Sequence, residues 1–344
     1  MNRKEAILKY QEEVSEYLNR SMEALEENFL KEEKKLKNNI CAIVIQLFSS
    51  VGDKERIQYI QMSLLRSRMD EDVFQILVSL HDETYFLDKN PLMQTLDVSS
   101  LFVPLKEARI ILYQRLEYYQ GKIEKFDADR MIRETAMTFY KKMADRCRML
   151  FRDMDRLNTG DKISETKRLV VKWGGFQEVC ETVFMTETNS KTQQQFLAYN
   201  EKNRLDQWDT RYVYQSWEYM QFTDVTEQKR NLLFIMFRNC QMERCQWENC
   251  LMHGASFRGA KLKQVIFAGC DLSGSDFRET EFDQVRFVQC NLSAADFTGN
   301  RIDTVQFTGS RMDDARFSRD SLSCGGLDVS QLQQIQMEEE SYVF

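Results

Sequence analysis

The sequence contains few of the residues on which catalytic sites are usually built. Its 344 residues include two histidines, two prolines and 13 glycines. His81 and His253 are far apart in the chain, and no nucleophile–histidine–acid order, Walker-type loop or dinucleotide-binding glycine motif is present. The glycine pair after Trp173 indicates a close helix contact rather than a phosphate cradle. We therefore predict a protein that is not an enzyme and that needs no cofactor.

Long hydrophobic runs are also missing. No run of about 18 apolar residues is present, so no membrane span is predicted. The first residues, Met1 to Ala6, include no apolar signal segment, and we expect a cytoplasmic protein. Both prolines, Pro91 and Pro104, fall within residues 87–105, where we expect a turn-rich break between helices.

What the sequence does contain is a five-residue repeat. From Phe237 to Leu322 every fifth residue is large and apolar. Because 42% of the chain is hydrophobic, such a run has a chance probability on the order of 10⁻⁷, so it is an internal repeat. The residue two places earlier is small in most repeats; Ile235, Asn300 and Asp320 are the exceptions. A period of five fits neither an α-helix nor a plain strand. The apolar positions are Phe237, Met242, Trp247, Met252, Phe257, Leu262, Phe267, Leu272, Phe277, Phe282, Phe287, Leu292, Phe297, Ile302, Phe307, Met312, Phe317 and Leu322.

A second period of 20 residues suggests how the repeats are stacked. Identical or similar residues recur at this interval, as in Val265, Val285 and Val305, which implies four repeats per turn. The pattern resembles the pentapeptide-repeat family, and this resemblance implies a right-handed quadrilateral β-helix. Eighteen repeats would give 4.5 turns, roughly 20 Å tall at ~4.8 Å per turn. The predicted core comprises Val265, Phe267, Cys270, Leu272, Phe277, Val285, Phe287, Cys290, Leu292, Phe297, Val305 and Phe307.

The nine cysteines fit the same pattern. Five occupy the small position of the repeat, where a thiol acts as a small hydrophobe. Zinc sites use Cys-x2-4-Cys pairs with partner ligands, and the spacing here differs, so no metal is predicted. These five are Cys240, Cys245, Cys250, Cys270 and Cys290.

The first two thirds of the chain shows mostly helical patterns. The predicted fold class is an α + β multidomain protein, with a mostly α-helical N-terminal domain before the β-helix and a short capping helix after it. The predicted domains are a long amphipathic helix at 1–40, an α-helical domain at 41–230, the β-helix at 231–325, and a capping helix with an acidic tail at 326–344. Within them we expect helices at 42–50, 54–68, 72–81, 105–125, 127–157, 164–184, 193–222 and 331–340, the last capped by Ser330.

The charge of the repeat region tests one function that the resemblance to the pentapeptide-repeat family implies. Some of its members mimic DNA and bind bacterial gyrase, which would require a dense array of negative charge. Residues 231–330 instead hold 11 basic and 13 acidic side chains. One predicted face mixes both signs, so mimicry is the alternative rather than the leading hypothesis, and nucleic-acid binding is disfavoured. The outward residues of that face are Lys261, Lys263, Glu281, Asp283, Arg301 and Asp303.

Another face carries a single charge, on Arg286. Its six outward residues are Ile266, Ala268, Arg286, Val288, Gln306 and Thr308, and we call them the low-charge face. Such a stripe favours contact with a protein partner, with a second copy of the chain, or with the protein's own helical domain. We predict a non-catalytic protein-binding scaffold or adaptor, bacterial by the resemblance. The alternatives are a DNA-mimicking modulator of a type II topoisomerase and a secreted effector with a pentapeptide-repeat rod.

Overall fold

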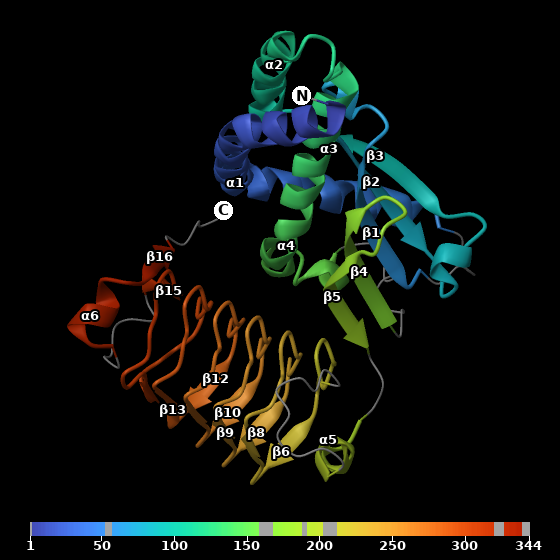
Figure 1. Ribbon diagram of the computed structural model, residues 1–344. Coiled ribbons are helices and arrows are strands. Elements are labelled where there is room, and N and C mark those ends of the chain that lie inside the picture. The colour runs from blue at the N-terminus through green and yellow to red at the C-terminus, as the bar shows by residue number, and fades with distance from the viewer. Residues whose placement is uncertain are drawn as a thin grey trace. The chain divides into compact units, whose positions relative to one another are not determined.

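The computed structural model describes residues 2–51, 57–157, 168–187, 191–201, 212–319 and 327–338. The chain forms two compact units, Met1–Phe184 and Met185–Phe344 (Figure 1). No helix in the described part of the chain is long and apolar enough to cross a membrane.

The N-terminal unit begins with one helix of 47 residues, α1 (Arg3–Ser49), capped by a reciprocal pair of hydrogen bonds between Asn2 and Glu5. The separate helices expected at 1–40 and 42–50 are therefore one. The reason is that Ile40 and Val44, both buried, continue the buried stripe of Tyr10 and the residues after it, which is apolar except at Ser21 and Glu33.

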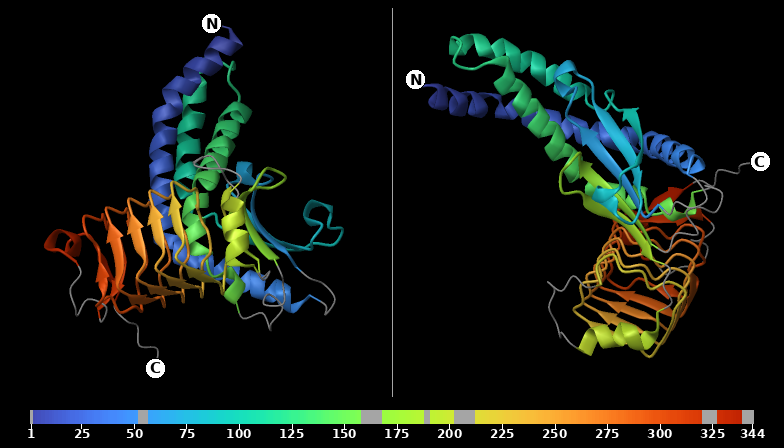
Figure 2. Two further views of the ribbon diagram at one scale, coloured as in Figure 1. Left: turned by 90° about the horizontal axis from the view of Figure 1, so that it is seen from below. Right: turned by 90° about the vertical axis from the view of Figure 1, so that its right-hand side faces the viewer.

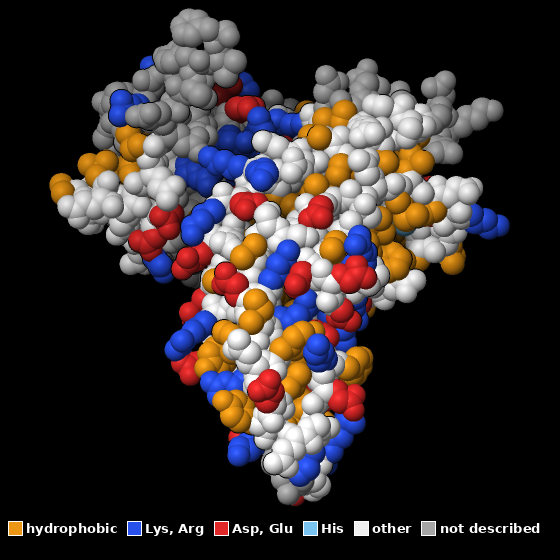
Figure 3. Space-filling model, turned by 90° about the horizontal axis from the view of Figure 1, so that it is seen from above, with side chains coloured by type: hydrophobic (Ala, Val, Ile, Leu, Met, Phe, Trp, Pro, Cys, Tyr) orange, Lys and Arg blue, Asp and Glu red, His pale blue; other side chains and the backbone are white. Residues whose placement is uncertain are grey.

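Two further helices, α2 (Val103–Leu116) and α3 (Lys125–Lys142), lie side by side with α1 (Figure 2). These helices confirm the helical N-terminal region. Pro104 lies in the first turn of α2, where a backbone N–H would have no partner within the helix, so its absence loses no helical hydrogen bond. Lysine and arginine side chains lie among aspartate and glutamate on the part of Figure 3 that carries these helices. The other helices in the described part of this unit are α4 (Ala144–Leu150) and the 3₁₀ turns at Met69–Glu71, Tyr85–Leu87, Glu117–Tyr119 and Met154–Arg156.

The helices predicted at 54–68, 72–81 and 164–184 are wrong, because these segments contain strands. Ile60 and Met62 alternate with Gln61 and Ser63, which is the two-residue period of a strand. The strands form one sheet in the order β3-β2-β1-β4-β5, in which β1 is antiparallel to β2 and parallel to β4. Their bounds are β1 Tyr59–Leu65, β2 Gln75–His81, β3 Leu92–Asp97, β4 Arg168–Gly175 and β5 Glu181–Glu187.

One face of this sheet packs on the helices. Trp173 of β4 stacks on Tyr140 of α3 with ring centroids 4.0 Å apart, and its indole N–H donates to the Tyr140 carbonyl oxygen. A Cβ added to Gly175 would lie 2.5 Å from the side chain of Met137. Gly175 therefore allows the close helix contact expected from the sequence, although the glycine pair lies on a strand.

The C-terminal unit is a β-helix in which parallel pairing joins residues 20 positions apart on four sides (Figure 2). Two sides are sheets in the orders β12-β10-β8-β6 and β14-β13-β11-β9-β7. The predicted fold is confirmed. The strands are β6 Gln221–Thr223, β7 Thr226–Gln228, β8 Gln241–Glu243, β9 Gln246–Glu248, β10 Lys261–Lys263, β11 Ile266–Ala268, β12 Glu281–Asp283, β13 Val285–Val288, β14 Val305–Gln306, β15 Arg316–Ser318 and β16 Gln336–Glu338.

The β-helix begins earlier than residue 231 and has about six turns rather than 4.5, since Ser216 already pairs with Met236. The predicted run of large apolar residues began at Phe237 and did not include the earlier turns, in which Glu227 takes a central position of the repeat. Glu227 is 3% exposed and lies 3.0 Å from the Arg230 guanidinium. Part of the helix expected at 193–222 exists as α5 (Gln193–Glu201), and its Phe196 packs on the first turn of the β-helix.

The structure that caps the last turn of the β-helix differs from the prediction. The capping helix is present but short, α6 (Val329–Leu332), and its N-cap is Asp328 rather than Ser330. The chain leaves the helix because β16 pairs with β15. The Gln331 side chain donates to the carbonyl oxygens of Phe307 (2.7 Å) and Ser310 (3.0 Å). Leu322 and the tail at 339–344 lie outside the described residues.

Candidate interaction surface

The interior of the β-helix consists of stacked rings. Phe267, Phe287 and Phe307 are parallel, with centroids 5.1 and 5.3 Å apart, and the Phe277–Phe297 pair of a second stack is 4.8 Å apart. All twelve predicted core residues are buried, none more than 2% exposed. A core packed in this way holds the strands above it in a fixed register, as a preorganised surface requires.

The small inward residues also satisfy backbone carbonyl groups. The Cys270 thiol donates to the Trp247 carbonyl oxygen at 3.2 Å, and the Ser275 hydroxyl donates to that of Met252 at 3.1 Å. Burial raises the pKa of the Cys240 thiol to about 12, so that thiol stays protonated and can donate at neutral pH. Asn300, an exception in the sequence pattern, makes the equivalent bond to the Phe277 carbonyl oxygen.

The structure aligns the low-charge face in two columns. On β11, β13 and β14, Ile266 pairs with Arg286 and Arg286 with Gln306, while Ala268 pairs with Val288. Ile266, Ala268 and Val288 are half-buried, whereas Arg286, Gln306 and Thr308 are exposed. The predicted residues therefore form one continuous strip over successive turns.

A shallow groove of about 690 Å³ runs beside this strip. Three members of the low-charge face line it, together with residues at the neighbouring corner that the sequence reasoning missed. Gln264 and Gln284 at that corner are 20 residues apart, and their side-chain amides are hydrogen-bonded at 3.1 Å. The 20-residue column of glutamine and threonine was the signal that could have revealed them. The lining residues are Gln264, Ile266, Gln284, Arg286, Asp303, Thr304, Val305 and Gln306.

The neighbouring face, on β8, β10 and β12, is charged but internally paired. Lys261 lies 2.9 Å from Glu281 on the next turn, and Lys263 lies 3.6 Å from Glu243. Exposed pairs of this kind contribute little stability, but they neutralise each other along the face. These strands therefore do not present a dense array of negative charge.

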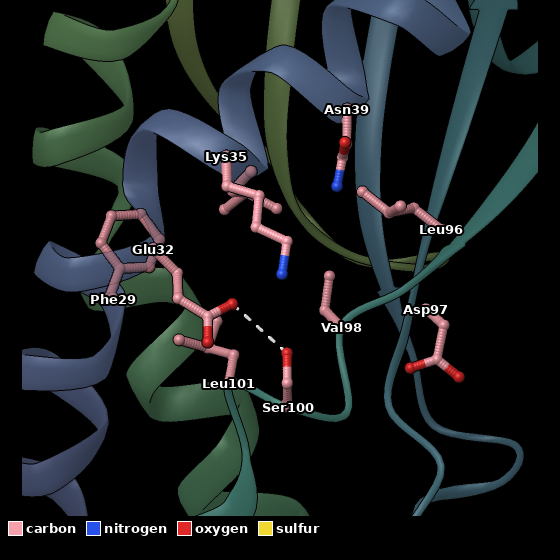
Figure 4. Close-up of a pocket in the computed structure, with 10 residues that line it drawn as sticks. Phe29, Glu32, Lys35, Asn39, Leu96, Asp97, Val98, Ser100 and Leu101 are labelled. Atoms are coloured by element: carbon pink, nitrogen blue, oxygen red, sulfur yellow. Dashed lines mark hydrogen bonds between the residues drawn. The ribbon is translucent and has the colours of Figure 1, made fainter.

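A second hollow lies in the N-terminal unit, between α1 and the segment that joins β3 to α2 (Figure 4). Its volume is about 50 Å³, which is enough for a few water molecules and too little for an organic ligand. Figure 4 shows Glu32 directed at Ser100, whose hydroxyl donates to it at 3.3 Å.

Comparison with known proteins agrees with this geometry. Residues 240–317 match the family model described as a pentapeptide repeat region. The β-helix is a pentapeptide-repeat domain. A comparison with curated proteins gave no match for the chain.

Several solved pentapeptide-repeat structures are similar to part of the chain. One, from Nostoc Pcc 7120, is 16% identical over 30% of this chain and 84% of its own, with a TM-score of 0.28. Another, Rfr23 from the cyanobacterium Cyanothece 51142, is 10% identical over 28% and 87%, with a TM-score of 0.23. QnrB1, a plasmid-mediated fluoroquinolone resistance protein, is 13% identical over 38% and 86%, with a TM-score of 0.19.

Proposed function

We propose that this protein is a non-catalytic scaffold or adaptor that binds another protein through the low-charge face of its pentapeptide-repeat domain. The observation that carries this proposal is the groove of about 690 Å³, which three residues of that face line. Interface cores are depleted in charge, and this strip has that composition while its neighbour does not.

The stacked core explains how such a face would bind. Because parallel pairing and ring stacking hold the strands, little conformational entropy is lost when a partner docks. The groove offers amide groups from Gln264 and Gln284 and apolar area from Ile266. The lining also carries one charge of each sign, on Arg286 and Asp303, so a hydrogen-bonding partner surface of low net charge fits this face best.

The charge arrangement argues against DNA mimicry. A mimic must replace one negative charge per ~1.7 Å of duplex. The carboxylates of Glu281 and Glu243 instead have lysine partners on an adjacent turn.

Matched substitutions test the proposal in an affinity pull-down from the native cell. Gln306→Glu adds one negative charge to the groove, and Gln241→Glu makes the same change on exposed β8, on the neighbouring face. We expect Gln306→Glu and Val288→Glu to weaken capture of a defined partner about tenfold, and Gln241→Glu to leave it unchanged. Equal capture by all three variants would refute the assignment of this face, and capture of a type II topoisomerase would favour mimicry.

A further inference from the structure

The second face of the N-terminal sheet is polar yet largely buried. Lys172 on β4 is in register with Gln61 on β1, which is in register with Ser79 on β2. Side chains in register project from the same face of a sheet, so these three form one row across three strands. Gln61 and Ser79 are 5% and 3% exposed, and Ser63, on the same face, is 1% exposed. We call these four residues, Lys172, Gln61, Ser79 and Ser63, the polar sheet face.

Uncharged side chains on this face are joined to one another. The Gln61 amide donates to the Ser63 hydroxyl at 2.7 Å, and Ser79 bonds the His81 ring at 2.9 Å. A sheet face that merely met solvent would be exposed, and a face made for packing would be apolar. This face is neither: hydrogen bonds within it satisfy its buried uncharged groups, which leaves the charge of Lys172 to be explained.

Lys172 is the charged group of the face and has no carboxylate partner among the described residues. It is half-buried, and its ammonium donates to the Thr182 hydroxyl at 2.9 Å. The carboxylates that follow Lys172 in sequence pair with helix residues instead: Glu178 lies 2.8 Å from Lys141, and Glu181 lies 2.5 Å from Arg148.

The environment of Lys172 disfavours its charge. Burial lowers the pKa of the Lys172 ammonium; Cys180 opposes this shift, and the positive charge of Arg168 acts in the same direction as burial. The free energy of a half-buried cation falls further when it binds an anionic ligand than that of an exposed lysine does.

A constrained loop places an aromatic ring beside the same face. Tyr85, in the loop between β2 and β3, has φ of 52°, which is unfavourable for a bulky residue. Bonds within the loop hold it there, including Thr84 N–H to the Asp82 carboxylate at 2.7 Å. The Tyr85 ring stacks on Tyr59 at 4.4 Å, and its hydroxyl donates to Gln61. Strain of this kind occurs often at ligand sites.

We propose that the polar sheet face binds a small molecule through one anionic oxygen group, a carboxylate or a phosphate. Lys172 supplies the charge-assisted hydrogen bond, and the uncharged neighbours supply the remaining polar contacts. A single lysine suits one anionic group on a small molecule and not a polyanion such as nucleic acid. This site is independent of the low-charge face.

The test is an NMR titration of the full-length protein at constant ionic strength. The probes are inorganic phosphate and acetate, followed through the backbone amide signals of Gln61 and Ser79. We expect at least one probe to move both signals saturably, and the one that does so identifies phosphate or carboxylate as the ligand group. Absence of saturation by either anion up to roughly 100 mM would overturn the proposal.

Variants locate the anion. Lys172→Gln should weaken binding at least tenfold, Lys172→Arg should retain it, and Lys89→Gln, at an exposed position in the same unit, should have no effect. Unchanged affinity in Lys172→Gln would refute the role of Lys172. If Lys172→Gln does not fold, the wild-type and Lys172→Arg titrations still decide, because loss of binding in a folded Lys172→Arg protein contradicts a site based on positive charge alone.

Discussion

At the scale of single residues, the five-residue period specifies which side chains enter the core. Its predictions held at all twelve predicted core positions because burial in each turn is set by local spacing. They did not extend back to Glu227, where a buried ion pair replaces an apolar side chain. No local pattern reveals that a charge is compensated, since its partner and its burial follow from the folded turn.

Two phenylalanines of the repeat allow a matched test of this core. Phe277 is fully buried between parallel rings, whereas Phe282 is partly buried. We expect Phe277→Ala to lower the free energy of unfolding by about 3–5 kcal/mol and Phe282→Ala by about 1–2 kcal/mol. Urea denaturation followed by tryptophan fluorescence measures both. Equal losses would contradict the stacked-core description.

Glu227 predicts a pH dependence of stability. Burial raises its pKa above the ordinary value of 4.5, although Arg230 opposes the shift. The folded state therefore binds the proton more tightly than the unfolded state does, and this contribution to stability is lost as pH rises through the raised pKa. Relative to Glu227→Gln, the wild type should become less stable as the pH rises above the ordinary pKa of 4.5 and through the raised pKa of the folded state. Thermal unfolding midpoints at several pH values check this, and a constant difference would contradict it.

At the scale of elements, the long helices α1, α2 and α3 could be predicted and the N-terminal sheet could not. Short apolar runs such as Ile76–Leu80 do not distinguish strand from helix without their pairing partners. β1 pairs with β4 across more than a hundred residues of chain, so local sequence could not identify the partner that makes its short alternating pattern a strand. The row of Lys172, Gln61 and Ser79 escaped prediction for the same reason.

The two ends of the β-helix provide an element-scale prediction. Phe196 contacts the rings of Tyr212, Trp217 and Phe222 at the first turn, while Gln331 bonds the last turn. Each turn contacts only its neighbours, so damage at one end should stay local.

Hydrogen exchange measures this locality. Phe196→Ala should reduce amide protection mainly at residues 212–237, and Gln331→Ala mainly at residues 305–318. Uniform loss of protection in either variant would show that the domain opens as a single unit.

At the scale of the whole molecule, the chain combines two units with separate cores. The 20-residue period was enough to predict the β-helix and the residues that share its low-charge face. The groove was not predicted, because Gln264 and Gln284 lie at a corner whose backbone, with φ of 55° and 56°, projects them beside the strip. The two proposed activities, protein binding and anion binding, therefore belong to different units.

The most direct test of protein binding is site-specific photo-crosslinking in the native cell. A photoreactive phenylalanine analogue would replace Val288 on the low-charge face or Asp283 on the neighbouring face, and the products would be resolved by mass. The account predicts a crosslinked protein of defined mass from position 288 and none from position 283. No product from position 288, or the same products from both positions, would contradict it.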